Sequence, residues 1–429
     1  MGDIAFLASI IAVVSLARVR LRALPLTAPM LFVAIGLVLG PDLLGVLDFG
    51  LDDETVALVA ELTLALVLFA DAARIDVKGS CANFDLPVRL LGIGLPLAIG
   101  LGTVMTAAVL TDLSWAEAAL VAAVLAPTDA ALGEAVVSNP AVPVRIRQAL
   151  NVESGLNDGL VVPVIAVFSA LAVGDELEGA GSIVGEALGE ITIAVAVGGA
   201  AAFALARIVP LIENRGWTDE EGFRLVALGV GVGAFAGSVA AGGNGFLAAF
   251  VCGLAARFLL GPMVTEHTEL AEDLGQVGAA ATFTIFGAVM VWPALEVTSP
   301  LIVLCAIGTL TVGRMIPVAI SMIGTGLRRP TVGFLGWFGP RGLASMLFGL
   351  LILAEGEVRN SDQLFSVITL VIVASVVLHG ITATPLAERY AAWYEHSSPD
   401  SMMESEPVAE SPLRWRRSTT TQTTPAEDR

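Results

Sequence analysis

The most regular feature of the chain is a succession of apolar stretches separated by short polar connections. A helix needs roughly 20 predominantly apolar residues to cross the hydrocarbon core of a bilayer. The apolar stretches, each of which predicts one membrane-spanning helix, are thirteen in number: 3–17, 27–47, 55–76, 88–111, 115–138, 147–174, 182–212, 221–241, 243–261, 269–291, 299–325, 331–354 and 362–391. The pattern therefore predicts an all-α polytopic membrane protein with about 13 transmembrane helices.

The basic residues in the connections indicate which way the helices run, because cytoplasmic loops of membrane proteins are enriched in Arg and Lys. Alternate connections carry nearly all of them: Arg18, Arg20, Arg22, Arg74, Lys78, Arg89, Arg145, Arg147, Arg207, Arg215, Arg224, Arg257, Arg314, Arg328, Arg329 and Arg389. The intervening connections are acidic or neutral except for Arg359. We therefore expect a multi-pass protein of the cell membrane with its N-terminus outside and its C-terminus in the cytoplasm. No cleavable signal peptide is expected, since the first basic residues follow the first apolar stretch.

Composition narrows the class of protein further. Hydrophobic residues make up 56% of the 429 residues and charged residues only 15%, whereas soluble proteins carry about 25% charged residues. A net charge of −19 disfavours a nucleic-acid partner. The cysteines Cys81, Cys252 and Cys305 are far apart and predict no metal or redox site. The segment 397–429, rich in Ser, Thr, Pro and Glu, predicts a disordered cytoplasmic tail.

Charged side chains inside the apolar stretches are candidate functional residues, because each costs a few kcal/mol to place in the membrane. Five stand out: Asp71, Asp129, Glu153, Asp158 and Arg341. Asp129 lies 9 residues before Ser138 and Asp158 lies 11 residues after Arg147. At about 1.5 Å per residue, both carboxylates are roughly 14–17 Å from the cytoplasmic end of their helices.

That depth is near the middle of a hydrocarbon core about 30 Å thick. Arg341, 10 residues into its own stretch, reaches the same level. A buried carboxylate with a second carboxylate beside it holds its proton more tightly. The arrangement therefore predicts a site that can hold either a proton or a cation.

The sixth stretch offers further oxygen ligands. Ser154 and Asp158 are four residues apart and share one face of a helix, whereas Glu153 and Asn157 share a neighbouring face. Hard monovalent cations prefer carboxylate, hydroxyl and backbone carbonyl oxygens as ligands. One face is therefore expected to bind an ion and the other to support the structure.

Two prolines interrupt apolar stretches near their middles. Pro127 and Pro340 each free backbone groups that must be satisfied locally. Broken helices in corresponding places of two halves are typical of a transporter site. An acid beside one break (Asp129) and a base beside the other (Arg341) are expected to offset half-helix dipoles of opposite sign.

At these residues the chain resembles the NhaP-type sodium/proton antiporters of the monovalent cation:proton antiporter superfamily, relatives of the eukaryotic sodium/hydrogen exchangers. The similar segments are Pro127-Thr128-Asp129, Glu153-Ser154-Gly155-Leu156-Asn157-Asp158-Gly159 and Gly339-Pro340-Arg341-Gly342. The resemblance extends over about residues 1–391. It implies an inverted repeat with two broken helices, elevator-like alternating access and a homodimer. Within a transmembrane domain of residues 1–396, it implies core helices at about 88–174 and 299–391, with dimerisation and scaffold helices elsewhere.

The resemblance also implies the ligands of the transported ion. Asp158 would bind Na⁺ or a proton, with Ser154 and the backbone carbonyl of Thr128 as further Na⁺ ligands. Asp129 would take part through water or charge. The family also places an acid on its third helix that helps to bind the ion, and Asp71 is the best match for this further Na⁺ ligand. Its surroundings lack the Glu-Gly pattern of many bacterial members, and its expected depth is shallower.

Three residues are implied to support the site. Glu153 would pair with Arg341, and Asn157 would hold the unwound segment together. Relatives that move two protons carry Asp-Asp and a titratable Lys where this chain has Asn157-Asp158 and Arg341. Arginine does not release its proton in proteins. We therefore expect electroneutral exchange of one proton for one cation.

Other interpretations of these residues remain open. Asp129 and Asp158 would also suit a structural pair that caps broken helices. Arg314 is expected to pack or snorkel in the cytoplasmic half. His379 in the last stretch is expected to be a hydrogen-bonded packing residue, with pH sensing as the alternative.

The transported ion and the class of protein leave alternatives too. K⁺ or Li⁺ in place of Na⁺ fits the same oxygen ligands, and a cation channel fits the same charges. An intramembrane aspartyl protease also needs two mid-membrane aspartates, but the residues before Asp129 and Asp158 do not match its motifs. We expect a transporter and not an enzyme, with no cofactor and with monovalent cations, protons and the lipid bilayer as its partners.

Overall fold

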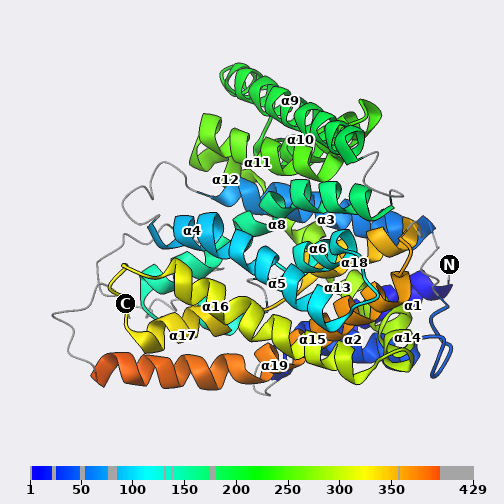
Figure 1. Ribbon diagram of the computed structural model, residues 1–429. Coiled ribbons are helices and arrows are strands. Elements are labelled where there is room, and N and C mark those ends of the chain that lie inside the picture. The colour runs from blue at the N-terminus through cyan, green and yellow to red at the C-terminus, as the bar shows by residue number, and fades with distance from the viewer. Residues whose placement is uncertain are drawn as a thin grey trace, which may run out of the picture.

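The computed structural model describes residues 2–21, 26–48, 54–75, 85–129, 132–137, 139–173, 180–355 and 358–396. Within these ranges every regular element is helical (Figure 1). The helices are α1 (Gly2–Leu21), α2 (Ala28–Leu39), α3 (Glu54–Arg74), α4 (Asp85–Arg89), the π-helical turn η1 (Leu90–Gly94), α5 (Leu95–Val109), α6 (Trp115–Val124), α7 (Glu134–Val137), α8 (Val144–Val173), α9 (Ala180–Glu213), α10 (Glu220–Ala240), α11 (Gly245–Leu260), α12 (Pro262–His267), α13 (Glu269–Val289), α14 (Val291–Glu296), α15 (Pro300–Leu310), α16 (Val312–Ser321), α17 (Arg329–Trp337), α18 (Leu343–Glu355) and α19 (Ser361–His396).

The expected all-α membrane architecture is confirmed. Each of the apolar stretches coincides with one helix or with consecutive helices of the array. In the described part of the chain, seven helices are long and apolar enough to cross a membrane, and further apolar helices are shorter. The total number of spans stays a prediction, as do the inverted repeat and the direction of the termini.

The two broken helices expected from the prolines are present. α6 ends at Val124 and α7 begins at Glu134, so Pro127 lies in the first break. α17 ends at Trp337 and α18 begins at Leu343, so Pro340 lies in the second. The helices are interrupted because proline lacks a backbone N–H and clashes with the preceding turn. Each break exposes helix ends in the middle of the protein, where their backbone groups need partners.

The helices pack into one array (Figure 1). α9, α10 and α11 lie at one edge and α16, α17 and α19 at the opposite edge, with α3, α5, α6 and α8 between them (Figure 1). α11 packs against α9 and α3, and α8 packs against α6, α3 and α9. The breaks themselves lie between α8, which packs against α6 and α7, and α19, which packs against α6, α7, α17 and α18. The division into core and dimerisation helices stays a prediction.

Some sequence predictions fall outside the described residues. The expected tail at 397–429 is one of them, and Cys81 is another. Cys252 and Cys305 are buried free thiols.

Candidate functional site

Asp129, which lies in the first break, forms hydrogen bonds with residues at the second break. Its backbone N–H donates to the carbonyl oxygen of Pro340 at 2.8 Å, and its Oδ2 accepts from the backbone N–H of Leu343 at 2.9 Å. Leu343 is the first residue of α18, where unpaired N–H groups and the helix dipole favour a negative charge. The carboxylate of one broken helix thus caps the half-helix of the other.

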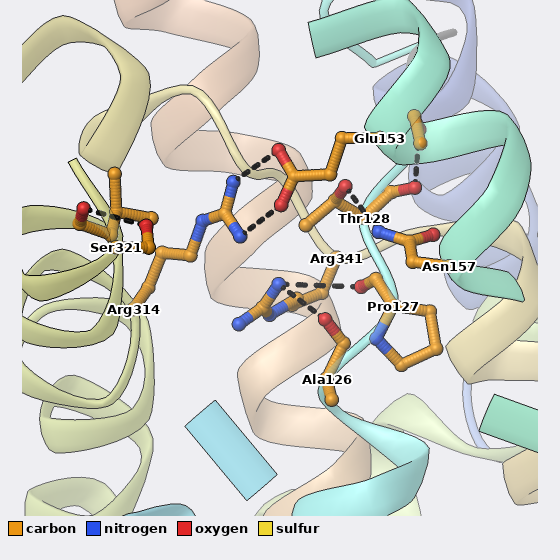
Figure 2. A network of polar contacts seen from close by, with 10 residues as sticks. Ala126, Pro127, Thr128, Glu153, Asn157, Arg314, Ser321 and Arg341 are labelled. Carbon is orange, nitrogen blue, oxygen red and sulfur yellow. Dashed lines mark hydrogen bonds and ion pairs between the residues drawn. The ribbon is translucent and has the colours of Figure 1, made fainter. Parts of the chain in front are cut away.

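Arg341 makes the reciprocal contact. Its Nη1 donates to the carbonyl oxygens of Ala126 and Pro127 at 2.9 and 3.3 Å (Figure 2). These carbonyls follow the C-terminus of α6, where the dipole favours a positive charge. The side chain is 2% exposed, so the charge is buried among helix ends. Asp129 and Arg341 therefore each offset the dipole of a half-helix that belongs to the other broken helix. The place where the two breaks meet is called the crossing.

α8 supplies the third wall of the crossing. The Ser154 hydroxyl donates to the carbonyl oxygen of Thr128. Asn157 Nδ2 donates to Thr128 Oγ1 at 2.8 Å (Figure 2). All three residues are buried. Two expected cation ligands, the Ser154 hydroxyl and the Thr128 carbonyl, are therefore neighbours, and Asn157 ties the unwound segment to α8.

Asp158 lies one turn after Ser154 on the same helix face. The residue is 8% exposed, and among the described residues no hydrogen-bond donor reaches its buried Oδ1. A buried polar atom without a partner is costly, and a buried carboxylate more so. The charged groups that act on it are Asp71 and Asp129, both acidic. This environment favours binding of a proton or a cation by Asp158.

Asp71 on α3 belongs to the same group of acids. Its Cβ would lie 3.9 Å from a Cβ added at Gly155 of α8, so α3 brings it against the turn that carries Ser154. It interacts electrostatically with Asp129 and has Arg74 as a positive neighbour. The packing of α3 against α8 therefore brings Asp71 closer to the site than the shallower depth expected from the sequence indicated.

A small cavity opens beside the crossing. Both breaks, α7 and the start of α8 line it, with Thr128, Asp129, Ser154 and Pro340 among the lining residues. Within the described residues, no three acidic, His or Cys side chains converge as a multidentate metal centre would require. The donor set is instead a mixture of carboxylate, hydroxyl and carbonyl oxygens, the kind that suits a weakly held monovalent cation.

Glu153 pairs with Arg314, and not with Arg341 as the resemblance implied. The two Arg314 Nη atoms donate to the two Glu153 carboxylate oxygens at 2.5 and 2.8 Å (Figure 2). Glu153 is 2% and Arg314 4% exposed. The bidentate geometry satisfies both Glu153 carboxylate oxygens, whereas the buried Arg314 Nε has no hydrogen-bond partner among the described residues. Arg341 remains free to cap α6 because Arg314 on α16 occupies the Glu153 carboxylate.

Arg314 was expected to pack or snorkel, and this expectation is wrong because its guanidinium forms a buried ion pair with Glu153. It lies 11 residues before Thr325, the last residue of its apolar stretch. At 1.5 Å per residue this is about 16 Å, the same depth as Asp158. Depth could therefore have placed Arg314 at the level of Glu153, although depth alone does not choose between two arginines.

Gly342 tests how closely the two breaks fit together. A Cβ at this position would lie 2.1 Å from Asp129 Oδ2, the atom that caps α18, and 2.7 Å from Leu132 Cδ1. We expect Gly342→Ala to lower the free energy of unfolding by about 1–3 kcal/mol through overpacking. Thermal unfolding of the purified protein measures it. Gly100→Ala on α5 is the matched control, because nothing lies within 4 Å of its added Cβ. Equal melting temperatures for the two variants would contradict the fit.

Comparison with known proteins places this geometry in a family. The family model described as "Sodium/hydrogen exchanger, transmembrane" matches residues 8–389. The K⁺/H⁺ antiporter NhaP of Alkalimonas amylolytica is 24% identical over 413 residues, which are 94% of this chain and 69% of the relative. A K⁺/H⁺ antiporter of Shewanella oneidensis is 25% identical over 369 residues, 83% of this chain and 62% of the relative. The chain thus spans about two thirds of the length of these relatives.

A solved structure shares the fold. The sodium proton antiporter of Methanocaldococcus jannaschii, determined at pH 8, superposes with a TM-score of 0.72 over 91% of this chain and 98% of that one, at 20% sequence identity. At that identity the likeness concerns the fold. The overall helical fold of this chain is therefore one already known from a solved membrane protein.

Proposed function

We propose that this chain, which belongs to the sodium/hydrogen exchanger family, exchanges a monovalent cation for a proton across the membrane. The observation that carries the proposal is the buried Asp158 carboxylate, whose Oδ1 has no donor among the described residues. It lies on α8 one turn after Ser154, whose hydroxyl donates to the Thr128 carbonyl at the crossing of two broken helices. One carboxylate that binds either ion, and never both, couples the two movements.

The residues supply a coherent ligand set for Na⁺. Asp158 provides the charge, and Ser154, the Thr128 carbonyl and Asp71 provide further oxygens. Asp129, already engaged with α18, acts on the site through its charge. K⁺ is the second candidate, because the curated relatives named above are K⁺/H⁺ antiporters. The same ligands can bind either ion, so a direct comparison of Na⁺ and K⁺ transport is needed to identify the transported cation.

The charges around the site support a one-for-one exchange. The carboxylate of Glu153 is neutralised by Arg314, and Asp129 and Arg341 are opposite charges at the same crossing. Asp71 has Arg74 as a positive neighbour, which also forms an ion pair with Glu272, whereas both charged neighbours of Asp158 are acidic. These contacts favour Asp158 as the carboxylate whose charge is cancelled in turn by a cation and by a proton.

Electroneutral transport follows from this charge balance. We expect wild-type protein in liposomes to exchange Na⁺ for protons at a rate that does not depend on the membrane potential. A K⁺ gradient with valinomycin sets this potential. A channel would instead carry current without moving protons. A current that follows the imposed voltage during exchange would contradict the one-for-one stoichiometry.

The fold also supports a mechanism by which the ions reach both sides of the membrane. The crossing is buried between α8 and α19, so one set of residues must be exposed in turn to each side. We propose elevator-like movement of the broken helices against the remaining helices, in a homodimer of the cell membrane with the N-terminus outside. This makes the chain a transporter and not an enzyme.

A pH-gradient assay tests the proposed function. Everted vesicles or proteoliposomes that contain the wild-type protein receive Na⁺, K⁺ and Li⁺ in turn, and a fluorescent dye reports the internal pH. At least one cation is expected to move protons, and the ranking of the three identifies the substrate. Folded, inserted protein that moves protons with none of them would refute the proposal.

A further inference from the structure

The second break has a partner on α19 that the exchange site does not require as a ligand. The backbone N–H of Arg341 donates to Ser375 Oγ at 2.6 Å. Ser375 Oγ lies 3.1 Å from His379 Nδ1, and His379 Nε2 lies 2.9 Å from the carbonyl oxygen of Trp337. The side chains of Ser375 and His379 are 0% and 2% exposed. Two residues of α19 thus reach both sides of the break.

The partners of His379 include two backbone carbonyl oxygens. The Trp337 carbonyl can only accept, so Nε2 must be a donor. Nδ1 lies 3.1 Å from Ser375 Oγ and 3.0 Å from the backbone carbonyl oxygen of Ser375. Both ring nitrogens are therefore held by polar partners, and Nε2 carries the hydrogen that the Trp337 carbonyl accepts.

Trp337 is where this connection meets α17. It is the last residue of the helix, and its carbonyl is one of the helix-end acceptors that lack a partner within the helix. Its indole Nε1 also donates to Thr382 Oγ1 at 3.0 Å, and its ring lies 5.2 Å from the His379 ring. The C-terminus of α17 is therefore fixed to α19 through both backbone and side chain.

We propose that His379 is a positioning residue for ion exchange, which acts through Ser375 and Trp337 to hold the second break, and with it Arg341, against the first. The proposal rests on the proposed function for its consequence in transport, while the contacts themselves are independent of it. His379 touches neither Asp158 nor the expected cation ligands. Its influence passes along the break to the guanidinium that caps α6.

Three substitutions separate positioning from bulk packing. The amide nitrogen of Gln reaches the place of Nε2, whereas Asn reaches only the place of Nδ1. We expect His379→Gln to keep at least about half the wild-type exchange rate, and His379→Asn to lower the rate about tenfold. Ser375→Ala is expected to lower it to a similar extent, and the double variant Ser375→Ala/His379→Asn no further, because both act through one connection.

The pH profile of exchange distinguishes a positioning residue from a proton carrier. His379→Gln is expected to retain the wild-type profile, because Gln does not titrate and a residue that only positions the break carries no transported proton. A displaced profile in this variant would overturn the proposal, and so would equal rates for the Gln and Asn variants. Ser366→Ala is the matched control, because it removes a buried hydroxyl of α19 that bonds Ala294 and not the break.

A measurement independent of transport keeps the inference testable even if the proposed function fails. Hydrogen–deuterium exchange by mass spectrometry reports the protection of the peptide that contains Phe338–Leu343. We expect faster deuterium uptake in His379→Asn and Ser375→Ala than in wild type, His379→Gln and Ser366→Ala. Unchanged uptake in the first two would overturn the positioning role, whereas a wild-type protein that moves no protons would refute only the proposed function.

Discussion

Asp158→Asn is expected to abolish cation-driven proton exchange while leaving the protein folded. The amide has nearly the shape of the carboxylate but can neither carry the negative charge nor release the proton. The protein should fold because the substitution removes a buried charge that has no partner at Oδ1 among the described residues. The pH-gradient assay measures the loss, and size-exclusion chromatography of the purified variant checks the fold.

A matched change elsewhere separates this result from a general effect of the substitution. Asp219→Asn makes the same replacement at the N-cap of α10, where the side chain accepts from the backbone N–H of Gly222 at 2.9 Å. Asn is an equally good cap, so this variant should transport like wild type. Exchange that persists in Asp158→Asn would place the shared ion and proton site on another residue.

Glu153→Gln is expected to cause the largest loss of stability. It leaves the Arg314 guanidinium 4% exposed and without its carboxylate partner. Breaking a buried ion pair by removing one partner costs about 3–5 kcal/mol, because the remaining charge is uncompensated. We expect a much lower melting temperature in detergent, and partial recovery in Glu153→Gln/Arg314→Met, in which neither charge remains.

An exposed pair provides the control for this experiment. Arg224 and Glu269 lie 3.0 Å apart with side chains 39% and 50% exposed. Pairs of this kind contribute about 0–1 kcal/mol, so Glu269→Gln should melt near the wild-type temperature. If Glu153→Gln were as stable as Glu269→Gln, the buried pair would not be the structural support that its geometry indicates.

The sequence was sufficient for much of this architecture because its strongest signals are local. Apolar length predicts the helices, and a proline at mid-depth predicts each break. Counting residues from a helix end places Asp129, Asp158 and Arg341 at one level. These inferences need only the rise per residue of a helix and the cost of a charge in the membrane.

The partners of those residues were less predictable, because they depend on how helices rotate against one another. Glu153 faces Arg314 on α16, and depth alone could not distinguish that arginine from Arg341. The position of Asp71 against Gly155 depends likewise on the packing of α3 on α8. His379 was expected to be a hydrogen-bonded packing residue, but its bond to the carbonyl of Trp337 requires knowledge of where α17 ends.

The central claim is that one carboxylate holds the cation and the proton in turn. The most direct test is the half-saturating cation concentration of the wild-type protein, measured in proteoliposomes over a range of pH with equal pH on both sides. If both ions compete for Asp158, this concentration rises as the pH falls, approaching about tenfold per pH unit where the site is mostly protonated, and saturating cation restores the maximal rate. A half-saturating concentration that stays constant with pH would contradict the shared site.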